Sequence, residues 1–250
     1  AYTPLKWFPK LFEEARRNDI IAFSSVFDPK SIDLMEELEA PCYKIASLEL
    51  VDHPLLKKVA ETKKPIILST GGCTLEEIEE ALEVIASTGN DQVILLKCVS
   101  AYPAPLQESN LITIADMIHR FELPIGLSDH TKGSLTSLLS IALGSSLIEK
   151  HFILSRNEPM LDAPFSLEPK ELASLVREAR LAFLARGVIH YGPTLHEKDN
   201  LKFRRSLICT KTIEKGETLT LDNVKPLRPG IGLPPKFLES VLGKKAKKRL

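Results

Sequence analysis

The feature that most limits how this chain can fold is a repeated alternation of short apolar segments and amphipathic helical segments. Six apolar segments rich in Ile, Val, Leu or Phe occupy residues 20–27, 42–46, 65–69, 92–97, 124–127 and 146–149. None alternates strictly with polar residues, which is typical of strands buried on both faces. Helical spacing follows them, most clearly at Leu75, Ile78, Leu82 and Ile85. The alternation predicts a parallel sheet with helices outside it.

The number of these units favours one architecture. Residues 5–17 have helical spacing but no strand before them, and six strand–helix units follow. This fits an α/β fold of the (β/α)₈ TIM-barrel type whose first two strands lie upstream of residue 1. A doubly wound open sheet is the rival, but it usually carries a GxGxxG turn, and only the short Gly71-Gly72 pair occurs here. We therefore expect a partial barrel, in a fragment or in a chain that completes its barrel in another way.

A second domain is expected after the barrel. Residues 1–186 form the predicted barrel domain, and the polar residues 187–204, with Gly187, Gly192 and Pro193, form a predicted linker. Residues 205–250 are predicted to be a small β-rich domain that stops short, with strands at 207–210 and 217–220 and a short helix from Pro234. Five Lys/Arg among residues 243–250 are interpreted as a solvated face or an interrupted element, not a functional basic tail.

Composition excludes several classes of protein. The 33 basic and 33 acidic residues balance, which argues against a nucleic-acid binder. Apolar runs such as 93–96 are too short for a membrane span, and the first residues do not resemble a signal peptide. The four scattered cysteines form no CxxC pair. We interpret them as reduced, mostly buried thiols of a cytoplasmic protein.

The chemistry is expected at the carboxyl ends of the strands, where a parallel barrel has its active site. Hydroxyls and a lysine gather there, namely Ser24, Ser25, Lys44, Ser47, Ser69, Thr70 and Ser128. Hydroxyls, helix-start N–H groups and an ammonium suit a phosphate dianion. Any single Ser or Thr is also explained as a helix cap. Lys44 is different, because it lies inside an apolar strand, where a buried ammonium needs a partner.

Two histidines, His130 and His151, end neighbouring predicted strands. Their imidazoles suit one divalent metal ion in an open catalytic site, because a closed structural site needs four ligands. The alternative is a pair of hydrogen-bonded histidines without a metal. A Ser/His/Asp hydrolase built on residues 128–130 is disfavoured, because adjacent residues cannot form a triad and GxSxG is absent.

Taken together, the strand-end segments resemble the sialic acid synthase family. The segments are FSSVFD (23–28), YKIASLE (43–49), LSTGG (68–72), GLSDHT (126–131), EKHF (149–152) and FSLEP (165–169). Residues 204–232 resemble the antifreeze-like (SAF) domain that follows the barrel in that family. Members condense phosphoenolpyruvate with an open-chain acylamino sugar. The resemblance therefore implies a transferase that forms a carbon–carbon bond and releases phosphate by C–O cleavage.

Within the family, KCVSAYPAP (97–105) and KIAS (44–47) are most similar to the pseudaminic acid synthase branch. N-acetylneuraminate synthases usually have His and Asn where this chain has Lys97 and Ser100. The resemblance implies 2,4-diacetamido-2,4,6-trideoxy-altrose as the sugar and pseudaminic acid as the product. N-acetylneuraminate or legionaminate synthase is the alternative. A non-catalytic truncated barrel and an aldolase that releases pyruvate also remain open.

The resemblance also implies roles for individual residues. His130 and His151 match the metal ligands, with Mn²⁺ expected and Mg²⁺ or Co²⁺ as alternatives. Glu49 and Lys44 match catalytic positions, Glu49 as a candidate general acid/base. Positions around phosphoenolpyruvate are matched by Ser25, Lys44, Ser47, Ser69, Ser100 and Ser128. Tyr102 and Asp162 match sugar-contacting positions. Arg228 matches an arginine that the SAF domain sends into the partner's active site in a domain-swapped homodimer.

The sequence departs from the family pattern at three places. The usual Gly-Pro-Asp before the last barrel helix reads Met160-Leu161-Asp162, which keeps the carboxylate but changes the loop. Phe203 is the nearest candidate for the aromatic residue of the linker. The family's first strands carry a glutamate and a Lys-Phe-Gln string that touch both substrates, and we expect these upstream of Ala1.

Overall fold

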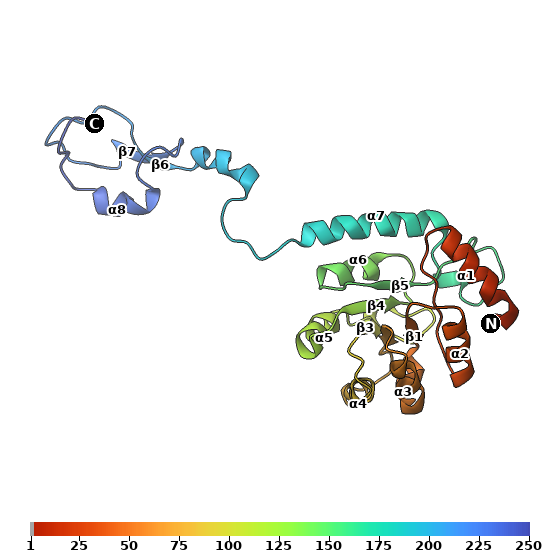
Figure 1. Cartoon of the computed structure of the whole chain (residues 1–250). Coiled ribbons are helices and arrows are strands. Elements are labelled where there is room, and N and C mark those ends of the chain that lie inside the picture. Colours follow the sequence, from red (N-terminus) through yellow and green to blue (C-terminus); the bar gives the residue numbers. More distant parts are fainter. Residues whose placement is uncertain (1–2) are drawn as a thin grey trace. The chain divides into compact units, whose positions relative to one another are not determined.

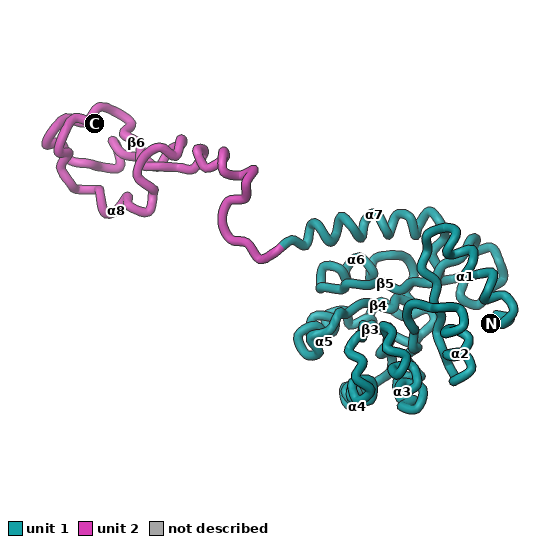
Figure 2. Tube along the Cα trace, in the orientation of Figure 1, with its two compact units in different colours: residues 1–187 teal, residues 188–250 magenta. Residues whose placement is uncertain are grey.

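The computed structural model describes residues 3–250, which form two compact units, 1–187 and 188–250 (Figure 2). Residues 1 and 2 of the predicted 1–186 domain lie outside the described residues. Within residues 3–250, none of the helices combines the length and the apolar character that a bilayer crossing requires.

The first unit is built on a five-stranded parallel sheet in the order β1-β2-β3-β4-β5 (Figure 1). Its strands are β1 (Tyr43–Ile45), β2 (Ile66–Ser69), β3 (Val93–Cys98), β4 (Ile125–Asp129) and β5 (Ile148–Lys150). Each strand pairs with the strand before it, as consecutive β-α-β units require. Five of the six predicted strands and the parallel sheet are therefore confirmed.

The predicted strand at 20–27 is wrong in extent. Only an isolated parallel bridge from Ser25 to Lys44 forms there, with Val26 N donating to Lys44 O at 3.1 Å. Ile20 and Ile21 are 62% and 72% exposed, so the apolar pattern that suggested burial does not describe them. One strand neighbour and little burial leave too few contacts for a ladder.

Helices surround the sheet. Figure 1 shows α2 to α6 following one another in chain order around its outside. The helices are α1 (Phe8–Arg17) after η1 (Leu5–Trp7), α2 (Pro29–Glu37), α3 (His53–Glu61), α4 (Leu75–Ser87), α5 (Thr113–Phe121), α6 (Leu135–Ala142) and α7 (Pro169–Arg186). Asp28 and Thr74 cap α2 and α4 through their side chains, which fixes where these helices begin. Short 3₁₀ turns are η2 (Ser47–Glu49), η3 (Leu106–Glu108) and η4 (Ala163–Phe165).

The core lies between the sheet and these helices. Tyr43, Ile45, Ile66 and Leu68 belong to it, together with apolar residues of α2, α3 and α4. Side chains alternate along a strand, so the residues between them point to the other side of the sheet. That is why Lys44, flanked by two core residues, faces a cavity instead. In contrast to the buried β1 and β2, all of β5 is only half-buried.

The second unit has its own small core of Ile213, Val224 and Ala246. Its elements are η5 (Leu195–Phe203), β6 (Ser206–Cys209), β7 (Val224–Leu227), η6 (Pro235–Phe237) and α8 (Leu238–Val241), with β6 and β7 antiparallel. The strand near 207–210 and the short helix after Pro234 are confirmed.

The predicted strand at 217–220 is wrong, since only an isolated bridge between Thr218 and Lys245 forms there. The partner of β6 is β7, which the sequence hid because Lys225 and Pro226 interrupt its apolar pattern. Residues 195–203 of the predicted linker form the 3₁₀ helix η5. Of the four cysteines, all free, only Cys98 is buried, and Cys209 is exposed, so the prediction of mostly buried thiols is wrong.

Candidate active site

A cavity of about 450 Å³ lies at the carboxyl ends of the strands of the first unit. Eight of the residues predicted from the sequence line it: Ser25, Lys44, Ser47, Ser69, Tyr102, Ser128, His130 and His151. They come from segments spread over more than a hundred residues of chain. The parallel sheet brings them together because all its strands end at one edge.

Lys44 is the buried cation of this cavity, with 6% of its surface exposed. Its Nζ donates to Ser69 Oγ and to Ile45 O, both at 2.7 Å, and lies 3.9 Å from Glu149 Oε2. The expected partner for a buried ammonium is therefore present, but at a distance. Burial lowers the pKa of Lys44, and the charge of Glu149 partly opposes that shift. An arriving anion would gain a close contact with an ammonium that has little solvent to lose.

The hydroxyls near Lys44 are held by a tight turn. Ser47 Oγ accepts from Gly71 N at 3.0 Å. A Cβ at Gly71 would lie 2.4 Å from Ser100 Oγ and 2.9 Å from Ser47 Oγ, so a side chain there would displace these two hydroxyls. From β4, Ser128 Oγ donates to Glu149 Oε1 at 2.6 Å. The cavity thus presents hydroxyls from β2, β4 and η2 around one ammonium.

The two imidazoles lie close together and line the same cavity as Lys44. The ring centroids of His130 and His151 are 5.3 Å apart, and the ring of Tyr102 lies 4.3 Å from that of His130. His130 Nδ1 contacts Val99 O at 2.9 Å, and His151 Nδ1 lies 3.5 Å from Asp162 Oδ2. Burial, and next the charge of His130, lower the pKa of His151. With each Nδ1 facing an acceptor, each Nε2 is left to act as a lone-pair donor.

Four predicted site residues do not line the cavity. Ser100 lies beside it, with its Oγ 3.5 Å from Gly71 O. Glu49 ends η2, and its charge acts on Lys44 without direct contact. Asp162 reaches His151, but its side chain is 57% exposed. Arg228 belongs to the second unit.

Five further residues line the cavity but were given no role from the sequence: Phe27, Ala46, Cys98, Glu149 and Lys150. Glu149 precedes His151 by two positions, so strand alternation places both on one face, and that signal was available. Cys98 gave no comparable signal. Its Sγ lies 3.8 Å from His130 Nδ1.

Comparison with known proteins assigns both units. Residues 1–191 match the NeuB family, and residues 204–250 match the SAF domain. The chain belongs to the NeuB family. Among NeuB relatives, a pseudaminic acid synthase of Helicobacter pylori is 44% identical over 253 residues, covering 100% of this chain and 74% of the relative. An N,N'-diacetyllegionaminic acid synthase of Campylobacter jejuni is 40% identical over 247 residues, covering 98% of this chain and 74% of the relative.

Solved structures agree with the assignment to NeuB. The N-acetylneuraminic acid synthetase of Leptospira borgpetersenii, solved with citrate, superposes with a TM-score of 0.76 at 34% identity, covering 80% of this chain and 70% of that one. A DAHP synthase of Thermotoga maritima superposes with a TM-score of 0.66 at 24% identity, covering 75% of this chain and 60% of that one. This likeness shows a shared fold only.

The sequence predicts a divalent metal ion held by His130 and His151. Among residues 3–250, no three His, Cys, Asp or Glu side chains gather as cation ligands. Two imidazoles with oriented Nε2 atoms beside a cavity fit an open catalytic site, where water and substrate fill the other positions, and do not fit a closed structural one. His130 and His151 are the residues that would hold the ion.

Proposed function

We propose that this NeuB-family chain carries the catalytic domain of a pseudaminic acid synthase. The reaction joins phosphoenolpyruvate, water and 2,4-diacetamido-2,4,6-trideoxy-altrose to give pseudaminic acid and phosphate. The observation that carries the proposal is one cavity that contains a buried ammonium among hydroxyls and, beside it, a pair of imidazoles. Identity of 44% to a pseudaminic acid synthase and 39% to a second one, from Campylobacter jejuni, supports the choice of sugar.

In this proposal, phosphoenolpyruvate binds at the Lys44 end of the cavity. The ammonium of Lys44 and the hydroxyls of Ser25, Ser47, Ser69 and Ser128 supply charge and hydrogen-bond donors for its phosphate and carboxylate. Ser100 lies close enough to the turn at Gly71 to take part after a small movement. These contacts would orient C3 of the enol toward the imidazole end.

The sugar aldehyde binds at the imidazole end, between Tyr102 and Asp162. A divalent cation held by His130 and His151, with Mn²⁺ proposed, would supply Lewis-acid polarisation of the aldehyde oxygen. C3 of phosphoenolpyruvate attacks the aldehyde carbon, and the aldehyde oxygen takes up a proton. Water then adds to C2 and gives up a proton, for which Glu49 is the proposed base, and the C2–O bond to phosphate breaks. Holding both reactants in one cavity supplies much of the rate.

The proposal includes completion of the barrel by two further strands. β5 is a half-buried edge strand that pairs only with β4 among the described residues. Beside it, an apolar groove of about 620 Å³ is lined by Ile141, Leu147, Phe183 and Leu184, among others. The other edge of the sheet ends in the single bridge at Ser25. Strands between these two edges would pair the free backbone groups and cover the groove.

The proposed domain arrangement is a barrel at 1–186, a linker at 187–204 and a SAF domain at 205–250. We further propose a cytoplasmic homodimer in which Arg228 of one copy reaches the cavity of the other. Free cysteines are compatible with a reducing compartment. An arginine is suited to this role because its guanidinium forms bidentate hydrogen bonds with a carboxylate or a phosphate.

The test is a turnover assay on the full-length gene product. The protein is incubated with phosphoenolpyruvate, Mn²⁺ and each of three sugars, those that lead to pseudaminic, legionaminic and N-acetylneuraminic acid. We expect phosphate release to be fastest with the 2,4-diacetamido-altrose, with a product of the mass of pseudaminic acid. Preference for another sugar would reassign the substrate, and pyruvate release would indicate an aldolase.

The same assay on the 250-residue chain tests whether it works without further strands. Because its β5 edge and apolar groove are open, we expect it to bind phosphoenolpyruvate but to turn over poorly. Equal turnover by the chain and the full-length protein would refute the need for added strands.

A further inference from the structure

β4 and β5, the strands that lead into His130 and His151, are joined by two cross-strand pairs of side chains that point to opposite faces of the sheet. Ser128 pairs with Glu149, and Asp129 pairs with Lys150, in the parallel register of β4 and β5. Ser128 and Glu149 hydrogen-bond inside the cavity. Because side chains alternate, Asp129 and Lys150 point to the helix side of the sheet, and the following residues, His130 and His151, return to the cavity.

The cross-strand pair on the helix side of the sheet, Asp129 and Lys150, is a buried ion pair. Lys150 Nζ lies 3.0 Å from Asp129 Oδ2, with side chains 3% and 1% exposed. The carboxylate also accepts from Thr131 N, Thr131 Oγ1, Thr136 Oγ1 and Ser137 Oγ, at 2.6–2.9 Å. Lys150 Nζ donates in addition to Thr131 O. The pair therefore ties together β4, β5 and the first turns of α6, and both oxygens of the carboxylate are satisfied.

β5 has only three residues, so few backbone hydrogen bonds fix its register against β4. A shift of one residue turns every side chain of a strand to the opposite face. It would point His151 and Glu149 away from the cavity and place Asp129 opposite Glu149 or His151. A shift of two residues would place Asp129 opposite Ile148 or Phe152 and leave a buried carboxylate without its ammonium. A buried ion pair adds little net stability, yet it discriminates strongly against such pairings.

We propose that Asp129 and Lys150 are positioning residues that fix the register of β5 and thereby set His151 opposite His130. Neither residue touches substrate in this role. They act through the strand that carries Glu149 and His151. The link to metal binding rests on the proposed function, whereas the link to register does not.

The experiment uses the full-length protein with Lys150→Met and, in case that variant folds poorly, Asp129→Asn, which keeps an oxygen for the hydroxyl donors. Mn²⁺ affinity is measured from the electron paramagnetic resonance of free Mn²⁺, and phosphoenolpyruvate affinity by calorimetry without metal. We expect Mn²⁺ affinity to fall about 10–100-fold, as for loss of groups that orient metal ligands. Phosphoenolpyruvate affinity, which depends on Lys44 of β1, should change less than about threefold.

The matched control is Lys64→Met, which removes the ion pair with Glu36 at 2.6 Å. Lys64 precedes β2, whereas the two histidines follow β4 and β5, at the opposite end of the parallel strands. A Mn²⁺ affinity that stays within about twofold in Lys150→Met, or that falls equally in Lys64→Met at equal loss of thermal stability, overturns the proposal.

The register of β5 is measured in a second experiment, by the backbone nuclear Overhauser contacts between β4 and β5. This experiment needs neither metal nor substrate. Native contacts retained at full intensity in both variants refute the positioning role. Absence of Mn²⁺ binding by the unmodified protein refutes the metal part of the proposed function instead, and leaves the register result to stand by itself.

Discussion

At the scale of single residues, the decisive side chain is Lys44, because its environment is neither that of a surface lysine nor that of a closed ion pair. Its position inside an apolar strand was enough to predict a special role from the sequence. Ser25, Ser69 and Ser128 could be placed in the same way, as strand-end residues. Glu49, Ser100 and Asp162 could not, because turns and loops have no periodicity that fixes where their side chains point.

Lys44→Met is expected to lower kcat/KM for phosphoenolpyruvate about 10²–10³-fold. The physical reason is loss of a desolvated charge-assisted contact, which costs about 2–5 kcal/mol when one partner of a buried pair is removed. The comparison variant is Lys57→Met, which removes an exposed lysine of α3. Steady-state kinetics at varied phosphoenolpyruvate concentration measure kcat/KM for both variants. A change of less than twofold would exclude Lys44 from the binding site.

At the scale of elements, hydrophobic pattern predicted most of the first unit, since strands buried on both faces and amphipathic helices have distinct sequence signals. It overestimated the strand at 20–27, because Ile20 and Ile21 are apolar but exposed to solvent. It missed β7, where Pro226 occupies a two-stranded ribbon in which every strand is an edge. Short strands of small domains depend on tertiary contacts more than on local pattern.

Thr74→Ala is expected to destabilise the protein by about 1 kcal/mol, the usual cost of losing an N-cap. Thr74 Oγ1 accepts from Glu77 N at 3.2 Å, and Thr74 N donates to Glu77 Oε2 at 2.7 Å. Urea unfolding followed by circular dichroism measures the change. Thr74→Ser keeps the hydroxyl and should retain most of the stability. Equal losses in both variants would show that the cap is not the cause.

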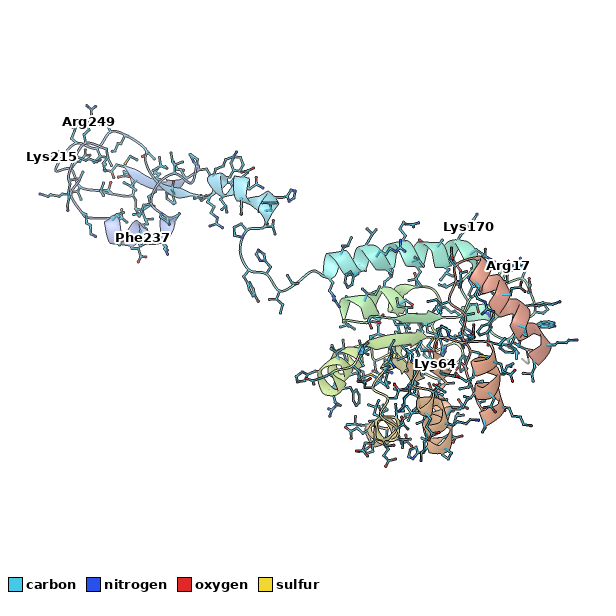
Figure 3. The ribbon with its side chains drawn as sticks, in the orientation of Figure 1. Arg17, Lys64, Lys170, Lys215, Phe237 and Arg249 are labelled. Carbon is cyan, nitrogen blue, oxygen red and sulfur yellow. The ribbon has the colours of Figure 1, made fainter. Side chains whose placement is uncertain are left out.

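Glu36 of α2 connects three elements, because it accepts from Tyr43 of β1 and from Lys64 after α3 (labelled in Figure 3). Partial burial opposes its ionisation, but the hydrogen bonds from Lys64 and then Tyr43 outweigh burial and hold its pKa below the ordinary 4.5. A lowered folded-state pKa contributes stability above the unfolded-state pKa and loses it as pH falls through the folded-state value.

Glu36→Gln should therefore be less stable than the unmodified protein at pH 7, and the difference should shrink as the pH falls below about 4.5. Chemical unfolding at a series of pH values measures it. The effect is modest because the Glu36 side chain is 43% exposed. A difference that is constant from pH 7 to pH 3 would contradict the assigned cause.

At the scale of the whole molecule, the balanced composition hides a separation of charge. Residues 1–187 carry 27 Asp+Glu against 19 Lys+Arg, whereas residues 188–250 carry 6 against 14. Arg249 and Lys215, labelled in Figure 3, belong to the basic unit. Balanced overall charge therefore disfavours polyanion binding by the chain as a whole but not by the basic unit alone. In the proposed homodimer, these opposite net charges would attract one copy of the chain to the other.

We expect the proposed dimer to weaken as NaCl rises from about 50 mM to about 500 mM, because the Debye length falls from about 14 Å to about 4 Å and the exposed charges are then screened from one another. Sedimentation velocity and small-angle scattering measure dimer fraction and radius of gyration. Replacing Lys244, Lys245, Lys247 and Lys248 with glutamine should reduce the salt dependence. A dimer fraction and a radius that are independent of salt would show that charge does not hold the units together.

The order of the strands in the sheet has a consequence for cotranslational folding. Because β1 to β5 pair strictly in chain order, each new strand can add to the one just made, without waiting for distant chain. The two imidazoles are carried by the last two strands of this series. A nascent chain thus completes the strand of Lys44 early and adds His130 and His151 last, so under the proposed function the cation site would form only at the end of domain synthesis.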